Sequence, residues 1–328
     1  MASGIPITSE TRVIINPLLQ MLLSKILFYG IVYPVSFLPL PVLYLTTDLG
    51  YFLLYFVFGY RKKVVRKNLK NAFPDLDDTA ILKIERKFYH HLTDLMAEGI
   101  KNLSISKKEL SKRMSVDNPE IMDTLHEKNK SVLLVSGHYN NWEFLITSQA
   151  FLFPQQAVGI GKPLTSKFWD KKLNELRGRF GMRIINHTNV SDKLTEWQKE
   201  SLSILALADQ SPGDSLKSYW MNFLHQPTAV LFGPELLANQ YDMAVVFFHM
   251  KKVKRGHYSI HLDLITETPR ELPYGTITEK HTSLLEDVIC KQPEYWLWSH
   301  KRWKRELPEN PEELRRKQQE GFEKKFRK

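Results

Sequence analysis

The feature that most constrains the fold is an alternation of short, β-branched apolar runs with helical stretches. The predicted strands are 131–136, 157–161, 203–208, 244–249 and 257–265. The predicted helices are 77–103, 142–151, 166–180, 191–200, 229–240 and 276–291. Such alternation favours an α/β fold with a single mixed, mostly parallel sheet flanked by helices. The last two strands are joined by a short basic loop, so we expect them to form an antiparallel pair.

A mostly apolar segment covers residues 17–60, interrupted by Pro34, Pro39 and Pro41. A membrane-spanning helix needs about 20 mostly apolar residues, and this segment barely provides them before the first proline. We expect two hydrophobic helices, one on or in a membrane and the other packed beside it. The alternative is a pair of buried core helices in a soluble protein. The pattern of a removable signal peptide is missing from the sequence.

The positive charge of the chain is clustered. The formal net charge is +10, and residues 61–70 carry six basic side chains and no acid. Basic clusters beside a membrane segment favour the anionic lipids of the cytoplasmic leaflet, so we expect the rest of the chain to face the cytoplasm. Nucleic acid is not an expected partner, because the sequence has no recognition motif for it. The predicted units are a membrane-associating segment 1–60, an α/β domain 61–308 and a charged helix or tail 309–328.

Several common site types have no signature in the sequence. The P-loop, the G-x-S-x-G elbow and the G-x-G-x-x-G loop are all missing, and the 11 histidines show no zinc-binding spacing. The chain has one cysteine, which rules out an internal disulfide and fits a reducing compartment. This residue, Cys290, lies in an apolar helical context, so we expect it in the core rather than as a nucleophile.

The stretch VSGHYNNWEF, residues 135–144, follows the first strand of the alternation. If His138 lies on the strand-to-helix turn and Glu143 in the first helical turn, their side chains can converge at the edge of the sheet where α/β proteins bind ligands. A neutral imidazole can take a proton from an attacking hydroxyl while a carboxylate holds its other ring nitrogen. The alternative is a surface histidine followed by an ordinary acid at a helix start.

Two further segments place polar side chains near the same edge. Lys162, Arg177 and Arg179 follow the second strand and suit a phosphate-bearing donor or acceptor, although they also fit a solvated helix face. Asp209 and Gln210 come directly after the strand 203–208, so we expect them over the same edge as His138, where turn formation is the competing explanation.

The segment EYWLWSHKRWKRE, residues 294–306, mixes aromatic rings with cations and includes His300 and Arg302. Such a mixture suits the headgroup region of a lipid bilayer, where aromatic rings lie at the polar boundary and cations meet phosphate. A structural aromatic cluster is the competing interpretation.

The order of these segments resembles a known family. SGHYNNWE, GKP, R-G-R-F-G, ADQ, the T-A-x-x-x-G-x-x-x-L-A pattern at 228–238 and EYWLWSHKRWK together resemble the bacterial lysophospholipid acyltransferase family of the lipid A biosynthesis (lauroyl/myristoyl) type. The resemblance runs from about residue 17 to 305. It implies a glycerolipid acyltransferase-like fold, an N-terminal membrane helix, a place at the cytoplasmic face of the bacterial inner membrane, and catalysis with no metal or organic cofactor.

The resemblance also implies an activity and site residues. A fatty acyl chain would pass from acyl carrier protein or coenzyme A to a hydroxyl of a membrane lipid, with His138 as general base, Glu143 as its acidic partner, and Asn141 and Trp142 in the same motif. The predicted substrate-binding residues are Asn141, Lys162, Arg177, Arg179, Asp209, Gln210, His300 and Arg302. Basic residues near the site would attract an acidic carrier protein. The expected acceptor is a lipid A precursor or a related lipid, and a monomer suffices.

The chain departs from the family pattern in two places. The segment after ADQ is SPGDSLKSYWMNFLHQPT, where a glycine-rich loop is common, and GKP stands where Arg-Lys-Pro is commoner. Both segments bear on substrate binding. They leave the identity of the acceptor open. Two alternatives to an O-acyltransferase are an N-acyltransferase that makes an amine-linked lipid with the same residues, and a non-catalytic lipid-binding protein at the membrane surface whose His138 and Glu143 are structural.

Overall fold

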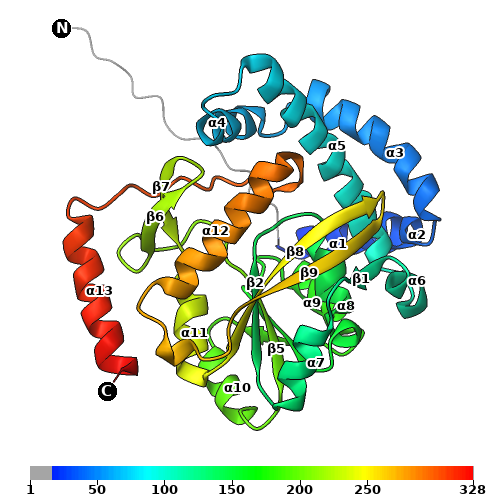
Figure 1. The fold of residues 1–328 in the computed structure, drawn as a ribbon. Coiled ribbons are helices and arrows are strands. Elements are labelled where there is room, and N and C mark those ends of the chain that lie inside the picture. The colour runs from blue at the N-terminus through cyan, green and yellow to red at the C-terminus, as the bar shows by residue number, and fades with distance from the viewer. Residues whose placement is uncertain (1–16, 328) are drawn as a thin grey trace, which may run out of the picture.

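The computed structural model describes residues 17–327. Its centre is a seven-stranded sheet in the order β1-β9-β8-β2-β5-β3-β4 (Figure 1). The strands are β1 Met114–Val116, β2 Val132–Ser136, β3 Gln156–Gly161, β4 Arg183–Asn186, β5 Leu202–Leu207, β8 Ala244–Lys254 and β9 His257–Thr266. The five strands from β8 to β4 run parallel, and β9 pairs with β8 antiparallel. The predicted α/β class with a mixed, mostly parallel sheet is confirmed.

Both faces of the sheet are covered, as the apolar composition of β2 requires. Every residue of β2 is buried. Leu134 contributes to a core cluster with Phe144 of α8, whereas Leu133 and Val135 contribute to another with Ala238 of α11. Neighbouring residues of a strand point to opposite faces, so β2 holds the two helical layers together.

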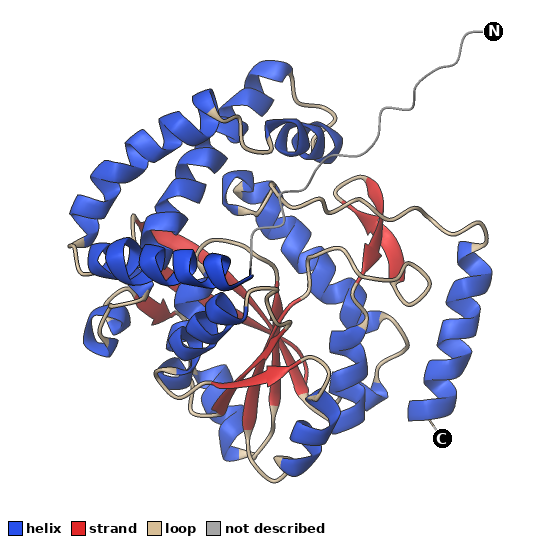
Figure 2. Cartoon of the chain, turned by 180° about the vertical axis from the view of Figure 1, so that it is seen from behind, coloured by secondary structure: helices blue, strands red, loops and turns tan. Residues whose placement is uncertain are grey.

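The helices predicted from residue 77 onward are all present, with bounds that differ from the predicted ones by at most four residues. The helices of the structure are α1 Pro17–Leu27, α2 Tyr33–Ser36, α3 Leu40–Phe52, α4 Lys62–Ala72, α5 Asp78–Asn102, α6 Lys107–Ser111, α7 Glu120–Glu127, α8 Trp142–Leu152, α9 Lys167–Gly178, α10 Val190–Glu196, α11 Gly233–Tyr241, α12 Thr276–Lys291 and α13 Pro311–Phe326. The charged end of the chain forms a helix, α13, beside a small hairpin (Figure 2). One prediction about side chains is wrong: Cys290 is exposed, because it lies on the outer face of α12.

Two N-terminal helices are long and apolar enough to cross a membrane. Leu18–Ser36 joins α1 and α2 through a π-helical turn, and Leu40–Val57 joins α3 to another π-helical turn, Leu53–Val57. Only 6% of the first window is buried in the protein, against 28% of the second, which packs on α5. This difference agrees with one exposed apolar helix and one packed beside the domain. The first 16 residues of the predicted segment 1–60 lie outside the described residues.

The sequence analysis missed the hairpin of β6 Tyr219–Phe223 and β7 Gln226–Val230, and it began the helix of α11 too early. It also predicted neither the short strands β1 and β4 nor the helices α4, α6 and α7. The hairpin lies in the segment that departs from the family pattern. Its two turn residues, Leu224 and His225, both have positive φ angles of 50° and 61°. Asn-Gly or Asp-Gly is the usual sequence for such a turn, so this pair gave no hairpin signal.

Candidate active site

Two adjacent parallel strands bring His138 and Asp209 together. Ser136 of β2 pairs with Leu207 of β5, so the second residue after each strand is His138 on one side and Asp209 on the other. Gly137 allows this approach, because a Cβ atom at its position would lie 2.8 Å from Leu285 Cδ2 and 3.0 Å from Asp209 Cβ. The site therefore lies at the carboxyl ends of the strands, the usual ligand position in α/β sheets.

The carboxylate of Asp209 holds His138 in a fixed orientation. Asp209 Oδ1 lies 2.6 Å from His138 Nδ1, and Asp209 Oδ2 accepts hydrogen bonds from the His138 backbone N–H at 2.9 Å and the Trp296 indole at 2.8 Å. A carboxylate at Nδ1 favours the tautomer with its proton on Nδ1 and a free lone pair on Nε2. This is the form of histidine that acts as a general base.

Asp209 remains ionised although it is buried. Burial by itself would raise the pKa of its carboxyl, but the neighbouring His138 and the hydrogen bonds from His138 and Trp296 lower this pKa to about 2. The carboxylate can therefore stabilise the imidazolium that forms when His138 takes a proton.

Glu143 lies in the first turn of α8, as predicted, but its carboxylate does not meet His138 in this structure. Its oxygens bind Arg177 of α9 instead, at 2.5 Å from Nη2 and 3.2 Å from Nε. The indole of Trp142 packs edge-on against the His138 ring, with 5.0 Å between centroids. The expected His138–Glu143 contact is thus replaced by two pairs, because Asp209 reaches the imidazole directly and a two-point guanidinium contact orients Glu143.

Gln210 and His300 complete the surroundings of the imidazole. The side-chain nitrogen of Gln210 lies 3.3 Å from His138 Nε2, where an amide N–H can donate to the free lone pair. His300 Nε2 accepts a hydrogen bond from the backbone N–H of Ser211 at 3.1 Å. Burial lowers the pKa of His300, which keeps its ring neutral and able to accept. His300 therefore fixes the turn that carries Asp209 and Gln210.

The remaining cations differ in their surroundings. Arg302 is buried, and desolvation lowers its pKa to about 10 despite the attraction of Asp209. Burial likewise lowers the pKa of Arg179 to about 10, and its guanidinium lies over the Phe180 ring and donates to the Leu103 carbonyl. Lys162 is exposed in the loop after β3. Of Lys162, Arg177, Arg179 and Arg302, only Arg177 contacts the acid of the predicted motif, Glu143.

Asn141 has a structural position in the motif. Its side chain caps α8 by accepting from the Phe144 N–H, and it donates to Glu98 of α5 at 2.5 Å. Glu98 also accepts from Tyr44 of α3 and Tyr258 of β9. Burial raises the pKa of Glu98, which the three hydrogen bonds partly counteract. This buried carboxyl group links the second apolar helix to the turn that carries His138.

Two supporting residues, Trp296 and Glu98, were not predicted for the site. Trp296 stood in a segment that the sequence analysis singled out, but its partner Asp209 is 87 residues away. Glu98 had no sequence signal beyond its position in a predicted helix. Within residues 17–327, no group of three or more His, Cys, Asp or Glu side chains is arranged to hold a metal ion.

Comparison with known proteins bears on the whole of this arrangement. No curated protein sequence matches the chain significantly. A family model described as bacterial lipid A biosynthesis acyltransferase matches residues 17–305, the range that contains the apolar helices, the sheet and every residue of the site. Because the match covers most of its length, the chain belongs to the bacterial lipid A biosynthesis acyltransferase family and is an acyltransferase.

Proposed function

We propose that the protein transfers a fatty acyl chain from an acyl thioester, carried by acyl carrier protein or coenzyme A, to a hydroxyl of a membrane lipid at the cytoplasmic face of the inner membrane. The acceptor is a lipid A precursor or a related lipid. The observation that carries the proposal is the buried Asp209 carboxylate at Nδ1 of His138, which leaves Nε2 for a substrate hydroxyl. The family match supports an enzyme rather than a non-catalytic lipid-binding protein.

The reaction needs one base and no covalent enzyme intermediate. His138 Nε2 takes the proton of the acceptor hydroxyl while its oxygen attacks the thioester carbonyl carbon. The carbon–sulfur bond then breaks, the thiolate leaves with the proton from the imidazolium, and an ester remains. In this path the acceptor hydroxyl takes the place that the Gln210 amide occupies, 3.3 Å from Nε2. Asp209 and His138 act as the orienting acid and the base, the roles that the sequence analysis gave to Glu143 and His138.

The surroundings of α9 support a lipid acceptor. Phe168 and Trp169 of α9 pack against Phe28 of the first apolar helix, each with 5.7 Å between ring centroids. Helix α9 also carries Arg177, which Glu143 orients. An acceptor that enters along the first apolar helix would bring its phosphate to Arg177, with Arg179 and Lys162 as further cations. We also propose that an apolar groove beside the strand ends holds the acyl chain.

The direct test is an assay of purified protein in detergent with an acyl thioester and a hydroxyl-bearing phosphorylated lipid. We expect the acceptor to gain the mass of one acyl chain as thiol is released. Mild alkali should remove this chain, because esters are cleaved where amides survive. An alkali-resistant product would favour the N-acyltransferase alternative. Release of no thiol with any acceptor, under conditions where the protein remains folded, would refute acyl transfer as proposed.

A double-mutant cycle tests the role of Glu143 through Arg177. The Glu143→Gln and Arg177→Gln variants should each lower kcat/KM for a phosphorylated acceptor, and the double variant should lose little more than either one. Groups in direct contact usually couple by roughly 0.5–3 kcal/mol, which is the difference from additivity that we expect. If the fold losses in kcat/KM of the two single variants multiply in the double variant, Glu143 instead has a role independent of Arg177, such as direct assistance to His138.

A further inference from the structure

A second candidate site lies away from His138, between α5, the end of α3 and the 3-10 turn Pro293–Tyr295. The cavity there measures about 670 Å³ and is lined by Tyr51, several α5 side chains, Lys252 of β8, Glu294 and Tyr295. Pockets of roughly 300–1,000 Å³ are typical of small-molecule binding sites. The rings of Tyr139 and Tyr295 pack together with 6.1 Å between centroids, and Tyr139 directly follows His138.

Cations dominate the lining of this cavity. Lys83, Arg86, Lys87 and Lys252 face two acids, Asp94 and Glu294. Lys87 pairs with Glu294 at 3.2 Å, and Lys252 pairs with Asp94 at 3.2 Å.

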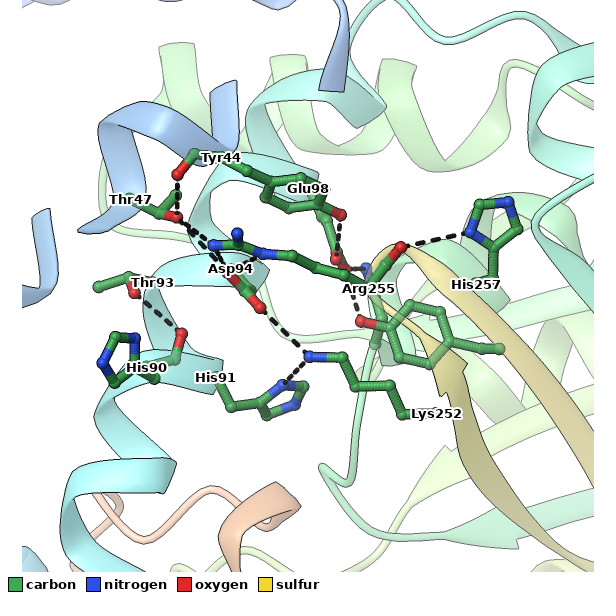
Figure 3. A network of polar contacts seen from close by, with 12 residues as sticks. Tyr44, Thr47, His90, His91, Thr93, Asp94, Glu98, Lys252, Arg255 and His257 are labelled. Atoms are coloured by element: carbon green, nitrogen blue, oxygen red, sulfur yellow. Dashed lines mark hydrogen bonds and ion pairs between the residues drawn. The ribbon is translucent and has the colours of Figure 1, made fainter. Parts of the chain in front are cut away.

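Asp94 is shared with a second cation. It also binds Arg255, at 2.8 Å from Nε and 2.5 Å from Nη2 (Figure 3). Lys83 and Arg86 form no ion pair with any carboxylate within the described part of the chain. The cavity therefore has excess positive charge that a phosphate group would balance.

His91 provides a buried donor in the same wall. Its side chain is 4% exposed, and its Nδ1 lies 3.4 Å from Lys252 Nζ, as Figure 3 shows. A lysine ammonium only donates, so Nδ1 accepts and the proton of the neutral ring lies on Nε2. Desolvation and the nearby Lys252 lower the pKa of His91 well below its usual range, which keeps the ring neutral. Among residues 17–327, Nε2 is buried and has no hydrogen-bond partner, so the wall of the cavity holds an unsatisfied donor.

An apolar groove begins next to the cationic cavity. It measures about 180 Å³, lies between α3 and α5, and is lined mainly by small and apolar side chains, among them Leu43, Gly50, Leu54 and Ala97. The two sites share neighbouring residues of the same helices: Gly50 lines the groove and Tyr51 lines the cavity. The cationic cavity and the apolar groove therefore lie next to each other along the boundary between α3 and α5, which we call the α3–α5 seam.

We propose that the α3–α5 seam binds one anionic glycerophospholipid, with its phosphate in the cationic cavity and one acyl chain in the apolar groove. The outer face of the second apolar helix supports this occupant, because Leu45, Leu49 and Phe52 of α3 and Phe56 of the π-helical turn after it are exposed and would lie among lipid chains. The bound lipid would contact Tyr295, whose carbonyl accepts the Asn140 N–H at 3.0 Å. It would thereby restrain the turn that carries His138. The site does not depend on acyl transfer.

The test is lipid retention by the full-length protein, measured by native mass spectrometry from detergent. We expect phosphatidylglycerol to be retained at one molecule per protein and phosphatidylcholine with the same chains to be lost. Removing two cations in the Lys83→Gln/Arg86→Gln variant should weaken retention by roughly 30-fold. The matched control is Arg316→Gln/Lys324→Gln, which removes the same charge from α13 and should leave retention unchanged.

Two further experiments distinguish binding of the lipid headgroup from binding of the acyl chain. Gly50→Leu adds a side chain to the groove, where the nearest atom to a new Cβ is 4.0 Å away, and should lower retention without altering the cations. Inorganic phosphate should compete weakly; if it displaces the lipid fully at millimolar concentration, the cavity is a soluble phosphate site and the proposal fails. Equal retention of both lipids, or equal effects of the two double variants, would also overturn it. Repeating the measurement on His138→Ala separates this result from the fate of the proposed reaction.

Discussion

Asp209→Asn is expected to lower the turnover of acyl transfer by about 10⁴-fold while the protein stays folded, as the corresponding change does in a Ser-His-Asp triad. The reason is the tautomer of His138. An asparagine can still accept from the His138 backbone N–H and the Trp296 indole through its oxygen, but its amide then donates to Nδ1. The ring proton moves to Nε2, and the lone pair needed by the acceptor hydroxyl is lost. Single-turnover measurements with saturating donor would report this loss in the rate constant of acyl transfer.

The comparison with His138→Ala makes the test specific. Removing the base should cost at least as much, about 10⁴-fold, the upper end of what a general base contributes, and combining it with Asp209→Asn should cost no more, because Asp209 acts only through the imidazole. Circular dichroism and thermal unfolding serve as controls for folding. If Asp209→Asn retains near-wild-type turnover while Glu143→Gln abolishes it, the His138–Glu143 pairing expected from the sequence is the functional one.

The sequence predicted the position of His138 better than the carboxylate that it contacts. β2 ends at Ser136 as its apolar run predicts, which places His138 on the turn after the strand. Asp209 and Gln210 were also expected at this edge, because a predicted strand precedes them. The direct contact was not predictable, since β5 pairs with β2 only after the chain has passed through β3 and β4. Local spacing favoured Glu143, which is near His138 in sequence but turns towards α9.

The polar network around Glu98 shows a second limit of sequence reasoning. A glutamate in an amphipathic helix such as α5 is most often exposed, and nothing in the sequence distinguishes Glu98 from its neighbours. Its burial depends on donors from three distant elements, Tyr44, Asn141 and Tyr258. Periodicity predicts which face of a helix is buried, but it does not predict which distant side chains meet a buried polar group.

The aromatic segment 294–306 illustrates an ambiguity that only the fold resolves. Trp and Tyr mixed with Lys and Arg are typical of membrane boundaries and of structural clusters alike. In the structure, Trp296 and Trp298 are 2% and 0% exposed, which favours the structural cluster. The exposed aromatic rings belong to the N-terminal apolar segment instead, for example Phe56 at 55% and Phe58 at 72%.

Trp298→Ala is therefore expected to lower the free energy of unfolding by about 3–5 kcal/mol, the usual cost of emptying a large aromatic site in a core. The indole packs against Trp296 and Phe73, and its N–H donates to the Pro293 carbonyl at 2.6 Å. The backbone carbonyl of Trp298 accepts from Asn68 of α4 at 2.9 Å. Denaturant unfolding in detergent measures the loss, and Phe56→Ala, on the exposed face, is the matched control with little expected change.

The same variant separates the two interpretations of the segment by a second measurement. If Trp298 supports the core, binding of the folded Trp298→Ala protein to vesicles should be unchanged at low temperature, whereas Phe56→Ala should weaken it. If Trp298 instead anchors the protein at a lipid boundary, the substitution should release the protein from vesicles and leave unfolding unaltered. Activity adds a further distinction: loosening Trp298 also frees Trp296, whose indole holds Asp209, so turnover should fall along with stability in the first case.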